Sequence, residues 1–64
     1  RVNSNSFTRL EMEVLTAMTQ GDKDKAVALG KSFNWLSDAG EPKKNRERAE
    51  FEDKLEGLGL KAPW

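Results

Sequence analysis

The amino-acid sequence predicts a small all-α protein: a three-helix bundle, or a helical hairpin with a third helix added, with an extended C-terminal tail. Apolar residues recur at three- and four-residue steps in three separate stretches, and glycines stand where these stretches end. No run of four or more residues alternates apolar and polar side chains among β-branched or aromatic types, as a strand would. The 64 residues make at most one domain. We expect a flexible tail over 1–6, a helical domain over 7–60 and an extended tail over 61–64.

The first helix is predicted over about 8–20. Thr8 and Glu11 have the spacing of a capping box, and Phe7 precedes the cap as the first half of a hydrophobic staple onto Met12. Gly21 suits the left-handed position that follows a helix end. The apolar face of this helix is expected to consist of Leu10, Val14, Leu15 and Met18.

The second helix is predicted over about 23–38, capped by Asp22 or Asp24. Gly30 lies inside its apolar stripe, where a missing side chain lets another backbone approach closely. Either a helix crossing within the domain or a groove for a partner would use that space. Gly40 then ends the helix. The expected stripe is Ala26, Leu29, Gly30, Phe33 and Leu36, widened by Val27 and Trp35.

The third helix is predicted over about 42–56, with Pro42 at its first position. Gly57 and Gly59 end it. The segment from Leu60 to Trp64 should be extended, because Pro63 pushes the preceding residue away from helical dihedrals. The residues expected to face inward are Ala49, Phe51, Leu55 and Leu58.

Composition argues against an enzyme and against a cofactor or metal site. The chain has no His, no Cys and no Tyr, so the usual general base, the usual nucleophile and the preferred zinc ligands are missing together. Glu50 and Asp53 share a helix face, but basic residues within helical reach favour an ion-paired surface over an acid–base pair. Asp22 and Asp24 resemble the start of a calcium loop, yet Ala26 stands where the third ligand belongs. We expect no catalytic residue and no small-molecule substrate.

The charge distribution gives no global attraction to nucleic acid or membrane. Eleven basic residues balance eleven acidic ones, and the balance also holds on either side of Gly40. The longest apolar run, Ala26 to Leu29, is far too short to span a bilayer. We therefore expect no membrane association and an intracellular, cytoplasmic protein.

One local segment departs from this balance, the basic run over 43–48. Its basic residues are Lys43, Lys44, Arg46 and Arg48. Basic side chains at the start of a helix oppose its dipole unless an anion offsets them. Two interpretations stay open: a solvated face with Arg46–Glu50 and Arg48–Glu52 pairs, or contact with an anionic partner such as a phosphate backbone or an acidic protein surface.

The aromatic residues provide candidate anchors for a partner. Trp35 lies beside the stripe of the second helix, with Phe33 on that stripe, and Trp64 follows Pro63 in the tail. Tryptophan is a preferred interface anchor, and it also enlarges the thin core of a small domain. For Trp35 the alternatives are core or interface. For Trp64 they are folding back over the helices or inserting into a partner.

Part of the chain resembles a known DNA-binding family. The pattern E-x-E-V-L, a later Gly and D-K-x-V-A resembles the first two helices of LuxR-type helix-turn-helix domains. It is carried by Glu11, Glu13, Val14, Leu15, Gly21, Asp24, Lys25, Val27 and Ala28. Asn45 to Arg48, ahead of Lys54 and Leu55, resembles the recognition helix of sigma-factor region 4. The resemblance implies that the basic run faces DNA phosphates. In LuxR-type domains the recognition helix follows the first two helices almost at once, whereas here the basic segment comes later in the sequence.

These observations predict a non-enzymatic helical interaction module, acting as an adaptor, an inhibitor or a subunit. It would dock through an apolar helix face on another protein or on a second copy, in the helix-in-groove mode. Its expected anchors are Phe33, Trp35 and Trp64. The alternative is a small DNA-binding regulator that uses the basic run over 43–48.

Overall fold

The computed structural model of the chain describes residues 6–64 and confirms the all-α fold class. Its helices are α1 (Arg9–Thr19), α2 (Lys23–Ser32) and α3 (Arg46–Gly57). In the part of the chain described, the one β pairing is an isolated antiparallel bridge between Leu36 and Pro42. The predicted tail over 1–6 lies outside the described residues, apart from Ser6, which is exposed.

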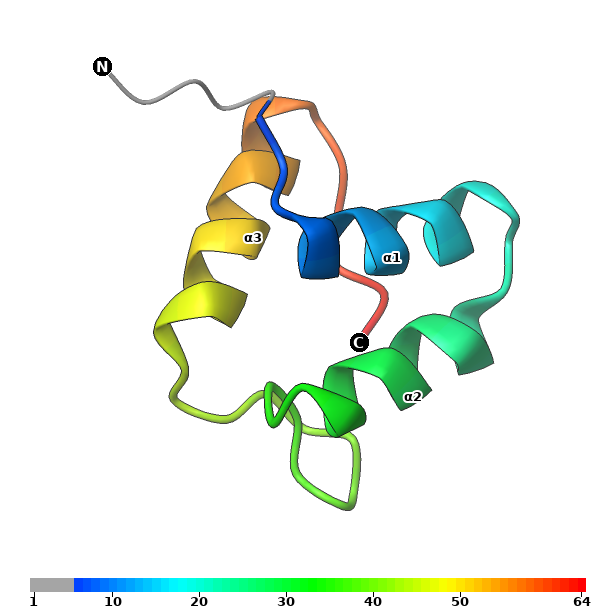
Figure 1. Cartoon of the computed structure of the whole chain (residues 1–64), viewed down its shortest axis with the longest axis vertical. Coiled ribbons are helices and arrows are strands. Elements are labelled where there is room, and N and C mark those ends of the chain that lie inside the picture. The colour runs from blue at the N-terminus through cyan, green and yellow to red at the C-terminus, as the bar shows by residue number, and fades with distance from the viewer. Residues whose placement is uncertain (1–5) are drawn as a thin grey trace.

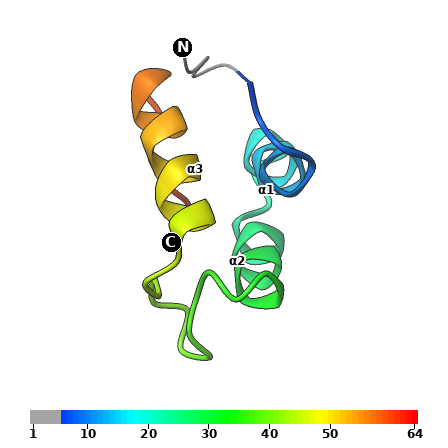
Figure 2. The same ribbon diagram turned by 60° about the vertical axis from the view of Figure 1, so that its left-hand side comes forward.

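The helices form a hairpin and a crossing partner. α1 and α2 lie side by side, run in opposite directions and are joined by a short turn, and α3 lies across the open end of this hairpin (Figure 1). In the turned view α3 forms a second layer facing the hairpin (Figure 2). After α3 the chain reverses, and its final segment ends between α2 and α3, where Trp64 contacts both layers. The tail is thus part of the packing.

All three helices end in the same backbone motif. A residue with positive φ follows each helix, and the next N–H bonds back to a carbonyl five residues earlier, as in a Schellman motif. The three left-handed residues are Gly21 (φ 72), Asn34 (φ 65) and Gly59 (φ 74). The matching bonds are Asp22 N–H to Ala17 O at 2.9 Å, Trp35 N–H to Gly30 O at 2.8 Å and Leu60 N–H to Leu55 O at 2.9 Å. Each helix therefore has a defined end.

The second of these motifs corrects the predicted helix boundaries. α2 was expected to reach residue 38 and stops at Ser32, because Asn34 takes the left-handed conformation that non-glycine residues other than Asn and Asp rarely adopt. The third helix was expected from Pro42 and begins at Arg46, since Asn45 accepts a bond from the Arg48 N–H at 3.1 Å and caps it. Pro42 instead lies in the bridge with Leu36.

The predicted N-terminal caps are confirmed. The Thr8 hydroxyl accepts from the Glu11 N–H at 3.3 Å, and the Glu11 carboxylate accepts from the Thr8 N–H at 2.8 Å. Asp22 accepts from the Lys25 N–H at 3.0 Å at the start of α2. Local sequence signals thus fix where α1 and α2 begin.

The core lies where α3 crosses the hairpin. Its buried apolar residues are Val14, Ala17, Ala26, Trp35, Leu36, Phe51 and Leu55. The prediction for α3 was right for Phe51 and Leu55 and wrong for Ala49 and Leu58, which are exposed. Ala49 falls on the opposite side of the helix, and Leu58 follows the last helical turn. The core is small, as expected for a chain of this length.

Candidate functional site

A buried ion pair joins α1 to α3. The Lys54 ammonium lies 2.7 Å from the Glu11 carboxylate, across 43 residues of sequence. The side chain of Glu11 is 2% exposed and that of Lys54 14% exposed. Lys54 also lies 5.8 Å from the centroid of the Phe7 ring, which covers it. Glu11 thus serves the cap of α1 and the contact between layers at once.

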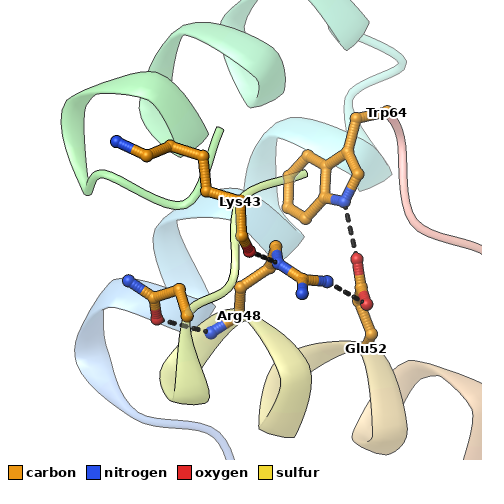
Figure 3. Close-up of polar contacts among 5 residues, drawn as sticks. Lys43, Arg48, Glu52 and Trp64 are labelled. Carbon is orange, nitrogen blue, oxygen red and sulfur yellow. Dashed lines mark hydrogen bonds and ion pairs between the residues drawn. The ribbon is translucent and has the colours of Figure 1, made fainter. Parts of the chain in front are cut away.

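A second junction is built around the indole of Trp64. Its ring lies 6.1 Å from Trp35 and 6.1 Å from Phe51, measured between centroids. Its Nε1–H donates to the Glu52 carboxylate at 2.8 Å (Figure 3). We call the residues around this indole the Trp64 seat. It consists of Gly30, Trp35, Phe51 and Glu52.

The acceptor in this seat is held in place by its neighbours on α3. The Arg48 guanidinium pairs with the Glu52 carboxylate and also donates to the Lys43 carbonyl oxygen at 2.7 Å (Figure 3). Since Arg48 is only 16% exposed, this contact chain is partly shielded from solvent. The indole of Trp64 therefore meets an oriented acceptor.

Gly30 makes room for the seat. A Cβ at this position would lie 2.8 Å from Leu36 Cδ1 and 3.3 Å from Trp64 Cζ3. The close approach predicted at Gly30 is thus made by two side chains inside the chain, and not by a crossing helix.

The structure brings the three predicted aromatic anchors together in one cluster. Trp35 is fully buried, so it has no surface for a partner in this conformation. Phe33 is half-buried and meets the Trp35 ring edge-on at 5.3 Å between centroids. Trp64 is also half-buried, folded back over the helices. All three rings therefore contribute to the internal packing of the fold.

The predicted basic residues divide into two kinds. Lys43, Lys44 and Arg46 are exposed, and Arg46 pairs with Glu50 at 3.1 Å with 91% of its own side chain in solvent. Arg48 is instead turned toward Glu52 and the Lys43 carbonyl. The two lysines precede the cap of α3, so they lie outside the helical turn whose dipole they were expected to oppose.

Sequence reasoning missed the apolar surface at the end of α3. Leu58 and Leu60 are each 43% exposed. Leu60 lines an open hollow of about 390 Å³, formed where the chain leaves α3. The hollow is lined by Glu52, Glu56, Gly59, Leu60, Lys61 and Ala62. The helical period suggested that Leu58 was internal, and only the position of the helix end shows otherwise.

A smaller hollow of about 310 Å³ lies between the tail and the turn that joins α1 to α2. It is lined by Met18, Gly21, Lys23, Ala62 and Pro63. Apart from Lys23 it has no charged lining residue.

Comparisons with protein families, with curated proteins and with solved structures find no match for this chain. None of the helices in residues 6–64 has the length and apolar character needed to cross a lipid bilayer. The geometry of the chain itself is therefore the basis for a functional proposal.

Proposed function

We propose that this chain is a non-enzymatic protein-binding module that docks on a partner through the end of α3. The observation that carries the proposal is the exposure of Leu58 and Leu60 beside an open hollow. Trp35 belongs to the core cluster and Phe33 and Trp64 pack against it, whereas Leu58 and Leu60 lie outside that cluster.

The exposed leucines are not needed to complete the core. The open side of the aromatic cluster is covered by Trp64, so the leucines lie outside a core that is already covered. Exposed apolar side chains next to a concave, partly charged rim are typical of contact sites for other proteins.

The charges around the hollow indicate the chemistry of the partner. Glu56 is exposed and lines the hollow with Glu52, against a single basic residue, Lys61. The C-terminal end of a helix adds partial negative charge at this place. A complementary segment would insert an apolar side chain and place a Lys or Arg beside it.

Affinity capture with charge-matched variants tests this surface. We expect Leu58→Glu with Leu60→Glu to lose the partner bound by the wild-type chain, because two carboxylates replace the apolar contact. Ala28→Glu with Ala49→Glu adds the same charge at two exposed positions elsewhere and should retain it. Equal capture by both double variants would contradict the proposal.

A second candidate function rests on the exposed basic side chains. Within residues 6–64 no carboxylate pairs with Lys43 or Lys44. If the chain bound DNA phosphates through Lys43, Lys44 and Arg46, a log-log plot of affinity against salt would have a slope of about −2.7. Arg48 is left out because its side chain is only 16% exposed and pairs with Glu52, whereas the side chain of Arg46 is 91% exposed. A binding constant that hardly changes with salt would favour the protein-binding module.

A further inference from the structure

We propose that the Trp64 seat also accepts Trp64 from a second copy, so that two chains exchange residues 60–64 and form a symmetric dimer. Leu60 belongs both to this segment and to the surface proposed above, whereas Leu58 belongs only to that surface. We call residues 60–64 the strap. Exchange of identical segments between copies needs no new contacts, because each seat regains the ligand it had in the monomer.

The seat has the features of a binding site for an indole. Trp35 and Phe51 contact the ring, and the lack of a side chain at Gly30 leaves space for it. Glu52 accepts the Nε1–H at 2.8 Å, with its carboxylate held by Arg48. A second copy offers the same indole on the same strap, so it is the partner whose fit the structure itself demonstrates.

The strap is attached mainly at its far end. Leu60 is 43% exposed and Lys61 is also exposed, whereas Ala62 and Trp64 pack against the core. The strap follows Gly59, an exposed residue with φ 74, and a Cβ at this position would meet no atom within 4 Å. Release of the Trp64 indole and of the small Ala62 side chain would therefore let the strap pivot at Gly59.

Chain connectivity sets which form is populated. In the monomer the seat and the strap belong to one molecule, so their effective concentration is high and the closed monomer is favoured in dilute solution. Exchange can be detected when a chain cannot fill its seat with its own Trp64 but can still receive Trp64 from another copy.

Two complementary variants of the full chain create that situation. Trp64→Ala has an intact seat and no indole to fill it. Gly30→Leu keeps Trp64 and fills its seat, since even a Cβ there would approach Leu36 and Trp64 closely. Native mass spectrometry of the equimolar mixture should show a 1:1 species at about twice 7.2 kDa. Neither variant alone should form it, and a mixture that stays monomeric would overturn the proposal.

A peptide titration decides the matter even if Gly30→Leu does not fold. ¹⁵N-labelled Trp64→Ala chain is titrated with a synthetic peptide of residues 59–64. We expect the Gly30 amide and the Trp35 indole resonances to shift in a saturable way, and the same peptide with Trp64→Ala to cause no shift. Absence of shifts with the native peptide would count against the seat as a site for a second copy.

The docking surface proposed at the end of α3 can be tested separately from the exchange of the strap. Leu58→Glu, placed in the Trp64→Ala partner of the mixture, should leave the 1:1 species intact, because Leu58 is not part of the seat. Loss of that species on this change would show that the dimer forms through the exposed leucines, and would contradict exchange of the strap.

Discussion

Two carboxylates hold this small fold together, and they do so in different surroundings. Glu11 joins α1 to α3 through Lys54, and Glu52 joins the strap to α3 through the Trp64 indole. Glu11 is 2% exposed, whereas the side chain of Glu52 is 31% exposed. Each of the two carboxylates accepts from two donors. The two sites differ in how deeply the carboxylate is buried.

The difference in burial predicts that the contact between α1 and α3 stays closed and that the contact between the strap and α3 can open. A buried charge that loses its partner stays desolvated and uncompensated, so breaking the Glu11–Lys54 pair is costly. A carboxylate near the surface regains water when its partner leaves, so breaking the Glu52 contacts costs little. The layers of helices should therefore stay together under conditions that free the strap.

The largest expected effect is that of Glu11→Ala. The change removes half of the capping box of α1 and leaves Lys54 without its carboxylate, and we expect a loss of about 3–5 kcal/mol in the free energy of unfolding. Urea denaturation followed by circular dichroism measures it. Glu13→Ala, at an exposed position of the same helix, is the matched control and should change stability by less than about 0.5 kcal/mol. Similar losses for both would break the comparison.

Trp64→Ala should come second. The half-buried indole loses its contacts with Trp35 and Phe51, and we expect a loss of about 2 kcal/mol. Trp64→Phe keeps an aromatic ring and loses the donor to Glu52, so it should cost only about 1 kcal/mol. Thermal unfolding of the two variants side by side gives both values. If Trp64→Ala were as unstable as Glu11→Ala, the strap would be held as firmly as α1 is held to α3, which would contradict the comparison.

Gly30→Ala should cost less, about 1 kcal/mol. Alanine favours a helix over glycine by up to about 1 kcal/mol, but its Cβ would lie 2.8 Å from Leu36 Cδ1 and 3.3 Å from the Trp64 ring. We expect the crowding to outweigh the gain. Repeating the substitution in Trp64→Ala should lower its cost, because one of the two obstacles is gone. Equal costs in the two backgrounds would show that Trp64 does not press on Gly30.

Glu52→Gln should have the smallest effect, about 0.5 kcal/mol. The side-chain carbonyl of glutamine can still accept the Trp64 N–H, and only the charge opposite Arg48 is lost, at a partly exposed position. Chemical denaturation should give a difference that shrinks from low to high salt, because salt screens the ion pair that the substitution removes. A loss of several kcal/mol would place Glu52 in the same class as Glu11.

Much of the fold follows from local signals. The capping box at Thr8, the cap at Asp22, the left-handed Gly21 and the inward pair Phe51 and Leu55 are all predictable, because each depends on residues within one or two helical turns. The early end of α2 was missed because Asn34, unlike glycine, is only an occasional left-handed residue, and the apolar period continues past it.

The junctions were harder to predict than the helices. Glu11 was predicted as a cap, but its partner Lys54 lies 43 residues away, and no local pattern links them. The seat combines residues of α2, of the segment that follows α2 and of α3, so the indole of Trp64 has two equally acceptable uses until the backbone is known. The pair of Arg48 with Glu52 was one of two interpretations of the basic run, and the further role of Arg48 in orienting the acceptor for Trp64 needs the folded tail.

The chain has two tryptophans and no tyrosine, and both indoles lie in the same cluster, 6.1 Å apart between centroids. Its ultraviolet emission therefore comes from two neighbouring chromophores, one fully buried and one beside a carboxylate at the edge of solvent. Lifting the strap moves one of them into water while the other stays in the core. The native protein thus has a built-in optical probe of strap opening, which can be followed in real time without any label.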